Sequence, residues 1–233
     1  MKTKSHSERC TTNTRRLCSC VSESINFTAK RCRNKFGMTL LFSALCIIIA
    51  VIANFFGSVL ARNITLPLYL DSVLTLAVTA LCRLWAGIAC AVLSNGVLWF
   101  FYNTSLPFTL CHILTAVCAY IVFRKYQIPN TTRNNSFQKV MQNSFQHLSI
   151  DTFLWAGLWS AITNAISGNV LVSLLFASAT SPNVDSSVQG IFIVVPNLTF
   201  ATYYAGVLTN LTDKIISAVV SYGAYKIGKK FLY

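Results

Sequence analysis

Two acidic residues lie inside apolar stretches of the sequence and are the first candidates for chemistry. Asp71 ends the run Leu66-Pro-Leu-Tyr-Leu, and Asp213 is followed directly by Lys214. A charge at the bilayer centre costs about 2.5 to 3.5 kcal/mol, so each needs a compensating partner. Asp71 can be a substrate or gate contact, or a helix-start anchor that bonds Ser72 or backbone amides. Neighbours on a helix point about 100° apart. We therefore expect Asp213 and Lys214 to find partners elsewhere, as a structural ion contact or as part of a proton relay.

Amide and tyrosine side chains form a second group of candidates. Asn164 and Asn169 fall in the outer half of one long apolar run, and Tyr203 and Tyr204 stand near the start of the last. Bonds across membrane helices, each worth about 0.6 kcal/mol, are their structural explanation. The alternative is a polar, aromatic-walled cavity that opens outward. The substrate-binding candidates for that cavity are Asp71, Asn95, Asn164, Asn169, Asn197, Tyr203 and Tyr204.

Patterns typical of catalysis or metal binding are missing from the sequence. There is no Gly-rich phosphate loop, HExxH pair, Gly-x-Ser-x-Gly elbow or carboxylate pair. His112 is a lone imidazole, which we expect to be a hydrogen-bonded interior residue, because no second His, Cys or acid has ligand spacing to it. Cys10, Cys18 and Cys20 match no common metal site, so reduced cytosolic thiols are expected. The sequence predicts no enzyme, cofactor or metal.

The composition is that of a membrane protein. The 233 residues are 54% hydrophobic and 11% charged, whereas an ordinary soluble domain carries about 25% charged residues. The net charge of +13 is concentrated at the two ends and in one loop, between apolar runs. That distribution follows the membrane pattern and offers no basic stripe for nucleic acid. Lipid is therefore an expected partner, and nucleic acid is not.

The apolar runs must position these candidates, and their number depends on Arg83. A span needs about 20 residues, and Arg83 alone interrupts the stretch 66–101. If the chain turns at Arg83, it crosses six times and 17 of the 19 Lys and Arg residues lie on one face. A single merged helix would violate the positive-inside rule. The predicted spans are about 36–61, 66–82, 84–101, 107–123, 152–179 and 198–225.

The predicted organisation is one all-α integral membrane domain, 36–233, behind a basic tail, 1–35. The tail carries nine Lys or Arg and two Glu, and we expect it to be disordered. Both termini are expected in the cytoplasm, with the chain in the cell (inner) membrane. The outer loop 180–197 is expected to be a lid or re-entrant piece, or an interfacial start to the last helix. Gly157, Ala161 and Ala165 recur every fourth residue and predict close helix packing.

Several motifs together resemble the substrate-capture (S) components of energy-coupling factor vitamin transporters. They match in order and spacing, over roughly residues 40–100 and 198–230. The matching residues are Asn54-x-x-Gly57, Leu66-Pro-Leu-Tyr-Leu-Asp71-Ser72, Gly87, Asn95 and Leu211-Thr-Asp213-Lys214-Ile-Ile-Ser-Ala218.

The resemblance implies a six-helix bundle that captures a vitamin or similar micronutrient in an outward cavity. A transmembrane T component and two ATPase subunits would supply the energy. The sequence departs from the family at Leu74-Thr75, where Gly-Thr is usual, and at Cys82-Arg83-Leu84, where Leu-Gly-Pro is usual. The nearest equivalent of the family's Ala-x-x-x-Ala docking motif is Ala53 with Gly57, placed further outward.

The leading hypothesis is therefore the substrate-binding subunit of such a transporter. Two alternatives stay open. One is a membrane sensor or scaffold, and the other is a stand-alone ion-coupled carrier of small solutes.

Overall fold

The computed structural model describes residues 37–64, 68–103, 106–126, 148–175, 193 and 197–232. By its contacts the chain divides into two units, Met1–Phe42 and Ser43–Tyr233. The helix Gly37–Asn63 begins in the first unit, and the other described helices belong to the second. The predicted tail 1–35 and nearly all of the loop 180–197 lie outside the described residues.

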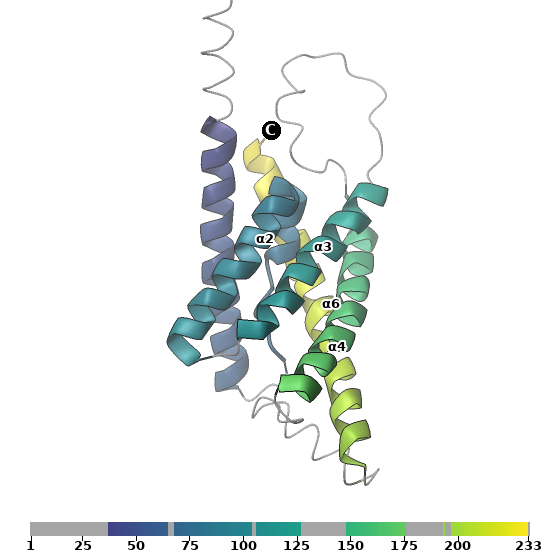
Figure 1. Ribbon diagram of the computed structural model, residues 1–233. Coiled ribbons are helices and arrows are strands. Elements are labelled where there is room, and N and C mark those ends of the chain that lie inside the picture. Colours follow the sequence, from purple (N-terminus) through teal and green to yellow (C-terminus); the bar gives the residue numbers. More distant parts are fainter. Residues whose placement is uncertain are drawn as a thin grey trace, which may run out of the picture. The chain divides into compact units, whose positions relative to one another are not determined.

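The described residues form helices and connecting segments, without a strand. The elements of Figure 1 are helix Gly37–Asn63, α2 (Thr75–Tyr102), the short 3-10 helix η1 (Leu106–Phe108), α3 (Thr109–Tyr126), α4 (Ile150–Leu175) and α6 (Leu198–Leu232). These bounds lie close to the predicted spans, with two exceptions. The helical part of span 66–82 is shorter than predicted, and α6 continues through Lys226, Lys229 and Lys230. Lysine is a good helix former and is favourable in the last turn of a helix, which explains the extension.

By length and hydropathy alone, three helical stretches are able to cross a membrane: Gly37–Asn63, Thr75–Tyr102 and Leu106–Tyr126. The second of them is interrupted at Arg83. Their surfaces agree, because large apolar side chains such as Phe56, Phe100 and Phe101 are more than 60% exposed. Small and polar residues fill much of the interior instead, among them Ser94, Thr115 and Ser160. Small polar residues inside and large apolar ones outside are typical of helices packed in lipid. The protein is thus a membrane protein.

The chain turns back on itself at Arg83, as predicted. Arg83 has non-helical backbone angles, φ 70° and ψ −174°. Asn54 Nδ2 lies 3.3 Å from Thr75 Oγ1 and 3.0 Å from Ser94 Oγ, although a straight helix would hold those two residues about 28 Å apart. A Cβ on Gly87 would likewise clash with the Thr79 hydroxyl. The prediction of two segments joined at Arg83 is confirmed.

The first of these two segments is only partly helical, so the helix within the predicted span 66–82 begins later than expected. Residues 68–74 are extended or turned, and helix begins at Thr75 (Figure 1). The sequence has Pro67 just before, which lacks a backbone donor, and Leu70 adopts φ 44°, outside the helical region.

Side chains from distant helices bond the backbone of segment 68–74. Leu70 N donates to Asp213 Oδ1 at 2.7 Å, and Leu74 N donates to Asn54 Oδ1 at 2.9 Å. Ser221 Oγ donates to the carbonyl of Val73 at 2.6 Å. Non-helical backbone is tolerated at membrane depth only where protein satisfies it in this way.

Close packing joins α3, α4 and α6 around the other side of the interior. The glycine and alanine residues at every fourth position of α4 predicted this close packing. In the structure, a Cβ on Gly157 would lie 2.8 Å from the carbonyl of Lys214 and 2.9 Å from Ala218 Cβ. Ala161 and Ala165 are buried. One turn before Gly157, the ring of Phe153 lies 4.8 Å from that of Phe123 on α3. The predicted close contact of α4 is confirmed, and its partner is α6.

Candidate functional site

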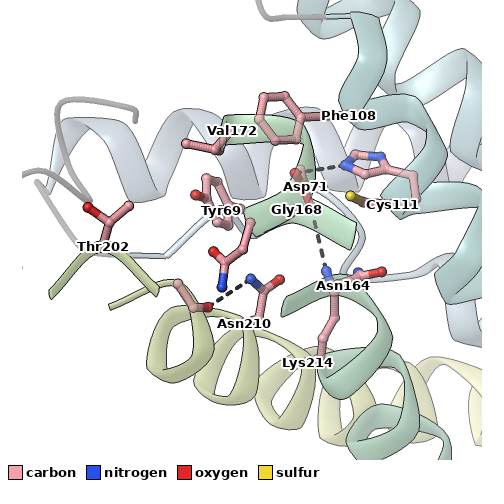
Figure 2. A pocket seen from close by; sticks show the side chains of 13 residues that line it. Tyr69, Asp71, Phe108, Cys111, Asn164, Gly168, Val172, Thr202, Asn210 and Lys214 are labelled. Carbon is pink, nitrogen blue, oxygen red and sulfur yellow. Dashed lines mark hydrogen bonds and ion pairs between the residues drawn. The ribbon is translucent and has the colours of Figure 1, made fainter. Parts of the chain in front are cut away.

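A small cavity lies between the non-helical segment 68–74 and helices α3, α4 and α6 (Figure 2). Its volume is about 60 Å³, which is room for a few water molecules. The lining residues are Tyr69, Asp71, Phe108, Cys111, His112, Asn164, Gly168, Asn169, Val172, Thr202, Gly206, Asn210 and Lys214. Polar and ionisable side chains make up more than half of this wall, in a bundle whose outer surface is apolar.

Asp71 and His112 form a pair at one wall of the cavity. His112 Nε2 lies 2.8 Å from Asp71 Oδ2. Asp71 reaches this position because its segment is not helical, and His112 lies in the first turn of α3, where it is 3% exposed. His112 is thus a buried, hydrogen-bonded interior residue, as expected, and its partner is an acid that the sequence did not indicate. Forty-one positions separate the two residues, so no local spacing could have revealed the pair.

Lys214 and Asp213 bring two more charges to the same place. Lys214 Nζ donates to Asp213 Oδ2 at 2.7 Å and to Ser72 Oγ at 2.5 Å, and it lies 3.8 Å from Asp71 Oδ1. Both residues are buried, with exposures of 2% and 0%. The expectation of partners on another element is correct. The expectation that these neighbours could not pair with each other was wrong, because the long lysine side chain curls back to the adjacent carboxylate.

Three polar atoms of the lining residues are buried without a hydrogen-bond partner among the described residues: Asp71 Oδ1, His112 Nδ1 and Asn164 Oδ1. An unsatisfied buried polar atom costs about 1 to 3 kcal/mol. Native proteins keep such atoms rarely, and usually where a ligand, ion or water completes them. All three residues line the same cavity, which makes it the candidate binding site.

The remaining amides of the lining are bonded to backbone carbonyls. Asn169 Nδ2 donates to the carbonyl of Tyr203 at 3.3 Å, and Asn210 Nδ2 donates to that of Gly206 at 2.8 Å. A Cβ on Gly206 would clash with Asn169 Oδ1. A glycine at 206 therefore makes room for the Asn169 side chain beside the cavity.

The structure brings three of the seven predicted binding residues to the cavity, namely Asp71, Asn164 and Asn169. Asn95 is not among its lining residues and instead bonds Thr109 Oγ1, between α2 and α3. Asn197 is exposed and its Oδ1 accepts from Phe200 N at 3.0 Å, as a helix cap does.

The two predicted tyrosines lie on the outer surface of α6. Tyr203 is 40% exposed, and its hydroxyl lies 3.0 Å from Ser173 Oγ. Tyr204 is 48% exposed and stacks on Phe200 with ring centroids 5.9 Å apart. Only the carbonyl of Tyr203 contributes near the cavity, through Asn169. The aromatic side chains that do line it are Tyr69 and Phe108.

The predicted docking residues Ala53 and Gly57 lie on helix Gly37–Asn63 and are half-buried. A Cβ on Gly57 would lie 2.5 Å from the carbonyl of Leu70. Gly57 thus lets segment 68–74 approach the first helix within this chain. Docking of a partner by these residues stays a prediction.

The chemistry that this cavity offers is binding through charges and hydrogen bonds. Within the described ranges, no group of three His, Cys, Asp or Glu residues is placed to hold a metal ion. The five described cysteines are free. No protein-family model, curated protein or solved structure matches the chain.

Proposed function

We propose that the chain is a multi-pass membrane protein that captures a small polar solute in the cavity beside Asp71, His112, Asn164 and Lys214. In its most specific form, it is the substrate-binding subunit of an energy-coupling factor transporter for a vitamin or similar micronutrient. A membrane T component and two ATPase subunits would energise release into the cytoplasm.

One observation carries this proposal. Three residues that line a cavity inside an apolar bundle carry buried, unsatisfied polar atoms, and Asp71 and Lys214 of the same lining form a charged pair. Charged residues inside a membrane bundle are costly, and they typically mark solute or ion pathways. A purely structural ion contact would be expected to satisfy its own atoms, as Asp213 does with Leu70 N and Lys214.

The proposed topology has six crossings with both termini in the cytoplasm of a cell whose inner membrane holds the protein. It rests on the reversal at Arg83 and on the positive-inside rule. Cysteine placed at position 83 should then react with an impermeant maleimide only from the cytoplasmic side, in a background whose other cysteines are replaced. Labelling from outside would contradict six crossings.

Capture of a vitamin-sized solute requires the cavity to widen. Ligand pockets usually measure about 300 to 1,000 Å³, whereas this one is about 60 Å³. Segment 68–74 is the element best suited to move, because it has few backbone bonds of its own and is attached through side chains such as Asp213 and Asn54.

The direct test is to purify the full chain and identify any co-purifying small molecule by mass spectrometry, followed by titration of vitamins. A bound micronutrient, lost in Asp71→Asn and kept in Ser173→Ala, supports capture, since Ser173 is exposed. Co-purification of two ATPases and a T component supports the transporter class. A purified chain with no bound ligand and no associated ATPase would contradict the proposal.

A stand-alone ion-coupled carrier is the second candidate, and the geometry adds to its case. Asp71, His112, Asp213 and Lys214 form one contiguous chain of titratable groups, which the sequence alone did not indicate. Proton relays in carriers are built from such groups. Uptake abolished by collapsing the proton gradient and unaffected by ATP depletion would favour the carrier over the transporter subunit.

A further inference from the structure

We propose that the cavity selects a compact cationic group with several N–H donors, such as a primary ammonium or an amidinium, and rejects carboxylates. This inference rests on the proposed capture function and names the chemistry of the captured solute. It is drawn from the identity of the three unsatisfied atoms, because each of them is an acceptor.

The first acceptor is His112 Nδ1. The Asp71 carboxylate can only accept a hydrogen bond, so His112 Nε2, at 2.8 Å from Asp71 Oδ2, must carry a hydrogen. In the neutral imidazole the other nitrogen is then an acceptor. That atom is buried without a partner among the described residues.

The second acceptor is Asn164 Oδ1, and its orientation follows from Thr115. The Thr115 hydroxyl donates its single hydrogen to the carbonyl of Cys111 at 3.1 Å. Its oxygen must therefore accept from Asn164, which places Nδ2 at 2.8 Å from it and leaves Oδ1 as the free atom. The reverse orientation of the amide would set two acceptors against each other.

The third acceptor is Asp71 Oδ1, which also carries the excess charge. Lys214 has its bonds to Asp213 and Ser72 and stays 3.8 Å away from Asp71. Lys214 is the one ammonium shared by the carboxylates of Asp71 and Asp213, so these two carboxylates exceed it by one negative charge. A cation with N–H donors would neutralise that charge and satisfy all three acceptors, whereas a carboxylate would meet repulsion from Asp71.

The size of the cavity limits what enters it without widening. A volume of about 60 Å³ takes a head group of a few heavy atoms. Acetamidinium, acetamide and acetate make a suitable set of probes, because they share one shape and differ in charge and in the number of N–H donors.

The experiment measures binding of these three probes to the purified full chain by thermal shift and calorimetry, with sodium chloride added to equalise ionic strength. Acetamidinium should raise the melting temperature, acetamide should raise it less, and acetate should leave it unchanged. Asp71→Asn should weaken acetamidinium by about tenfold or more, since one charged contact is lost.

Asn164→Ala is the second variant, because it removes one acceptor and leaves the charges in place. It should also weaken acetamidinium, whereas the exposed variant Ser173→Ala should not. If acetate binds to the wild-type chain and acetamidinium does not, the cavity does not select a cation, and an anion bound at Lys214 is the better explanation. If none of the three probes raises the melting temperature, the proposed cation selectivity is wrong, and water alone fills the cavity. A micronutrient found by mass spectrometry in either case would leave the capture function standing.

Discussion

Lys214 and Asp213, adjacent in the chain, form a buried ion pair in which Nζ lies 2.7 Å from Oδ2. The same carboxylate accepts from the backbone of Leu70 on the segment before α2. The pair therefore has a structural role in attaching that segment, whereas Asp71 Oδ1 has an ion pair with Lys214 at 3.8 Å but no hydrogen-bond partner among the described residues. Two acids 142 positions apart thus have different tasks around one lysine.

Asp213→Asn is expected to destabilise the protein more than Asp71→Asn does. Removing one partner of a buried pair leaves the other charge uncompensated, at a cost of about 3 kcal/mol. Asp71→Asn should cost less than about 1.5 kcal/mol, because Lys214 keeps Asp213 and the amide can still accept from His112. Unfolding in a detergent titration measures both.

The double variant Asp213→Asn with Lys214→Met is the internal control for this prediction. It removes the uncompensated charge and keeps an acceptor for Leu70 N, so it should be more stable than Asp213→Asn alone. A double variant less stable than the single one would show that the charge of Lys214 is not the source of the loss.

Asn54→Ala should destabilise the protein by about 2 to 3 kcal/mol. Asn54 is fully buried and bonds Thr75, Ser94 and the backbone of Leu74, so its loss leaves several polar groups without partners. The matched control is Ser173→Ala, whose exposed bond to Tyr203 should contribute less than about 0.5 kcal/mol. Equal losses in the two variants would contradict the role of Asn54 in joining the first helix to α2.

Arg83→Gly should be more stable than Arg83→Ala by about 1 to 2 kcal/mol. Backbone angles of φ 70° and ψ −174° fall in a region that essentially only glycine adopts without strain. Both variants lose the arginine side chain, so their difference isolates the strain. Thermal unfolding of the pair measures it, and an alanine variant as stable as the glycine variant would contradict a strained turn.

Gly157→Ala should destabilise the protein by about 1 to 3 kcal/mol, because its Cβ would lie 2.8 Å from the carbonyl of Lys214. Gly223→Ala is the matched control on α6, where a Cβ meets nothing within 4 Å. It should be neutral or stabilising by up to about 1 kcal/mol. If the two substitutions have the same sign and size, α4 and α6 do not pack closely at Gly157.

Sequence reasoning predicted the helices well because hydropathy and charge are local properties. The break at Arg83 could be predicted from a single charge between two apolar runs, and the contact at Gly157 from small residues every fourth position. The non-helical segment 68–74 could not, since its sequence is mostly apolar like that of the helices. Its backbone is held by Asp213 and Asn54, which are far away in the sequence.

The candidate site was predicted less completely. Asp71, Asn164 and Asn169 could be selected because polar residues are rare in apolar runs. Asn197 precedes α6 and caps it instead of lining the cavity. Tyr203 and Tyr204 lie on the outer surface of α6, because a helix rotated by one residue turns a side chain from the interior to the surface. The role of His112 depends on a contact across 41 positions, which periodicity does not encode.

The half-helical segment before Arg83 also has a consequence for biogenesis. Residues 75–82 make too short a helix to partition into lipid alone, and the backbone of residues 68–74 takes its donors and acceptors from Asn54, Asp213 and Ser221. Two of these partners belong to α6, which the ribosome delivers about 140 residues later. Insertion of residues 68–82 must therefore be completed after α6 has been synthesised. A nascent chain that ends before α6 would leave this segment exposed to the quality-control machinery of the cell.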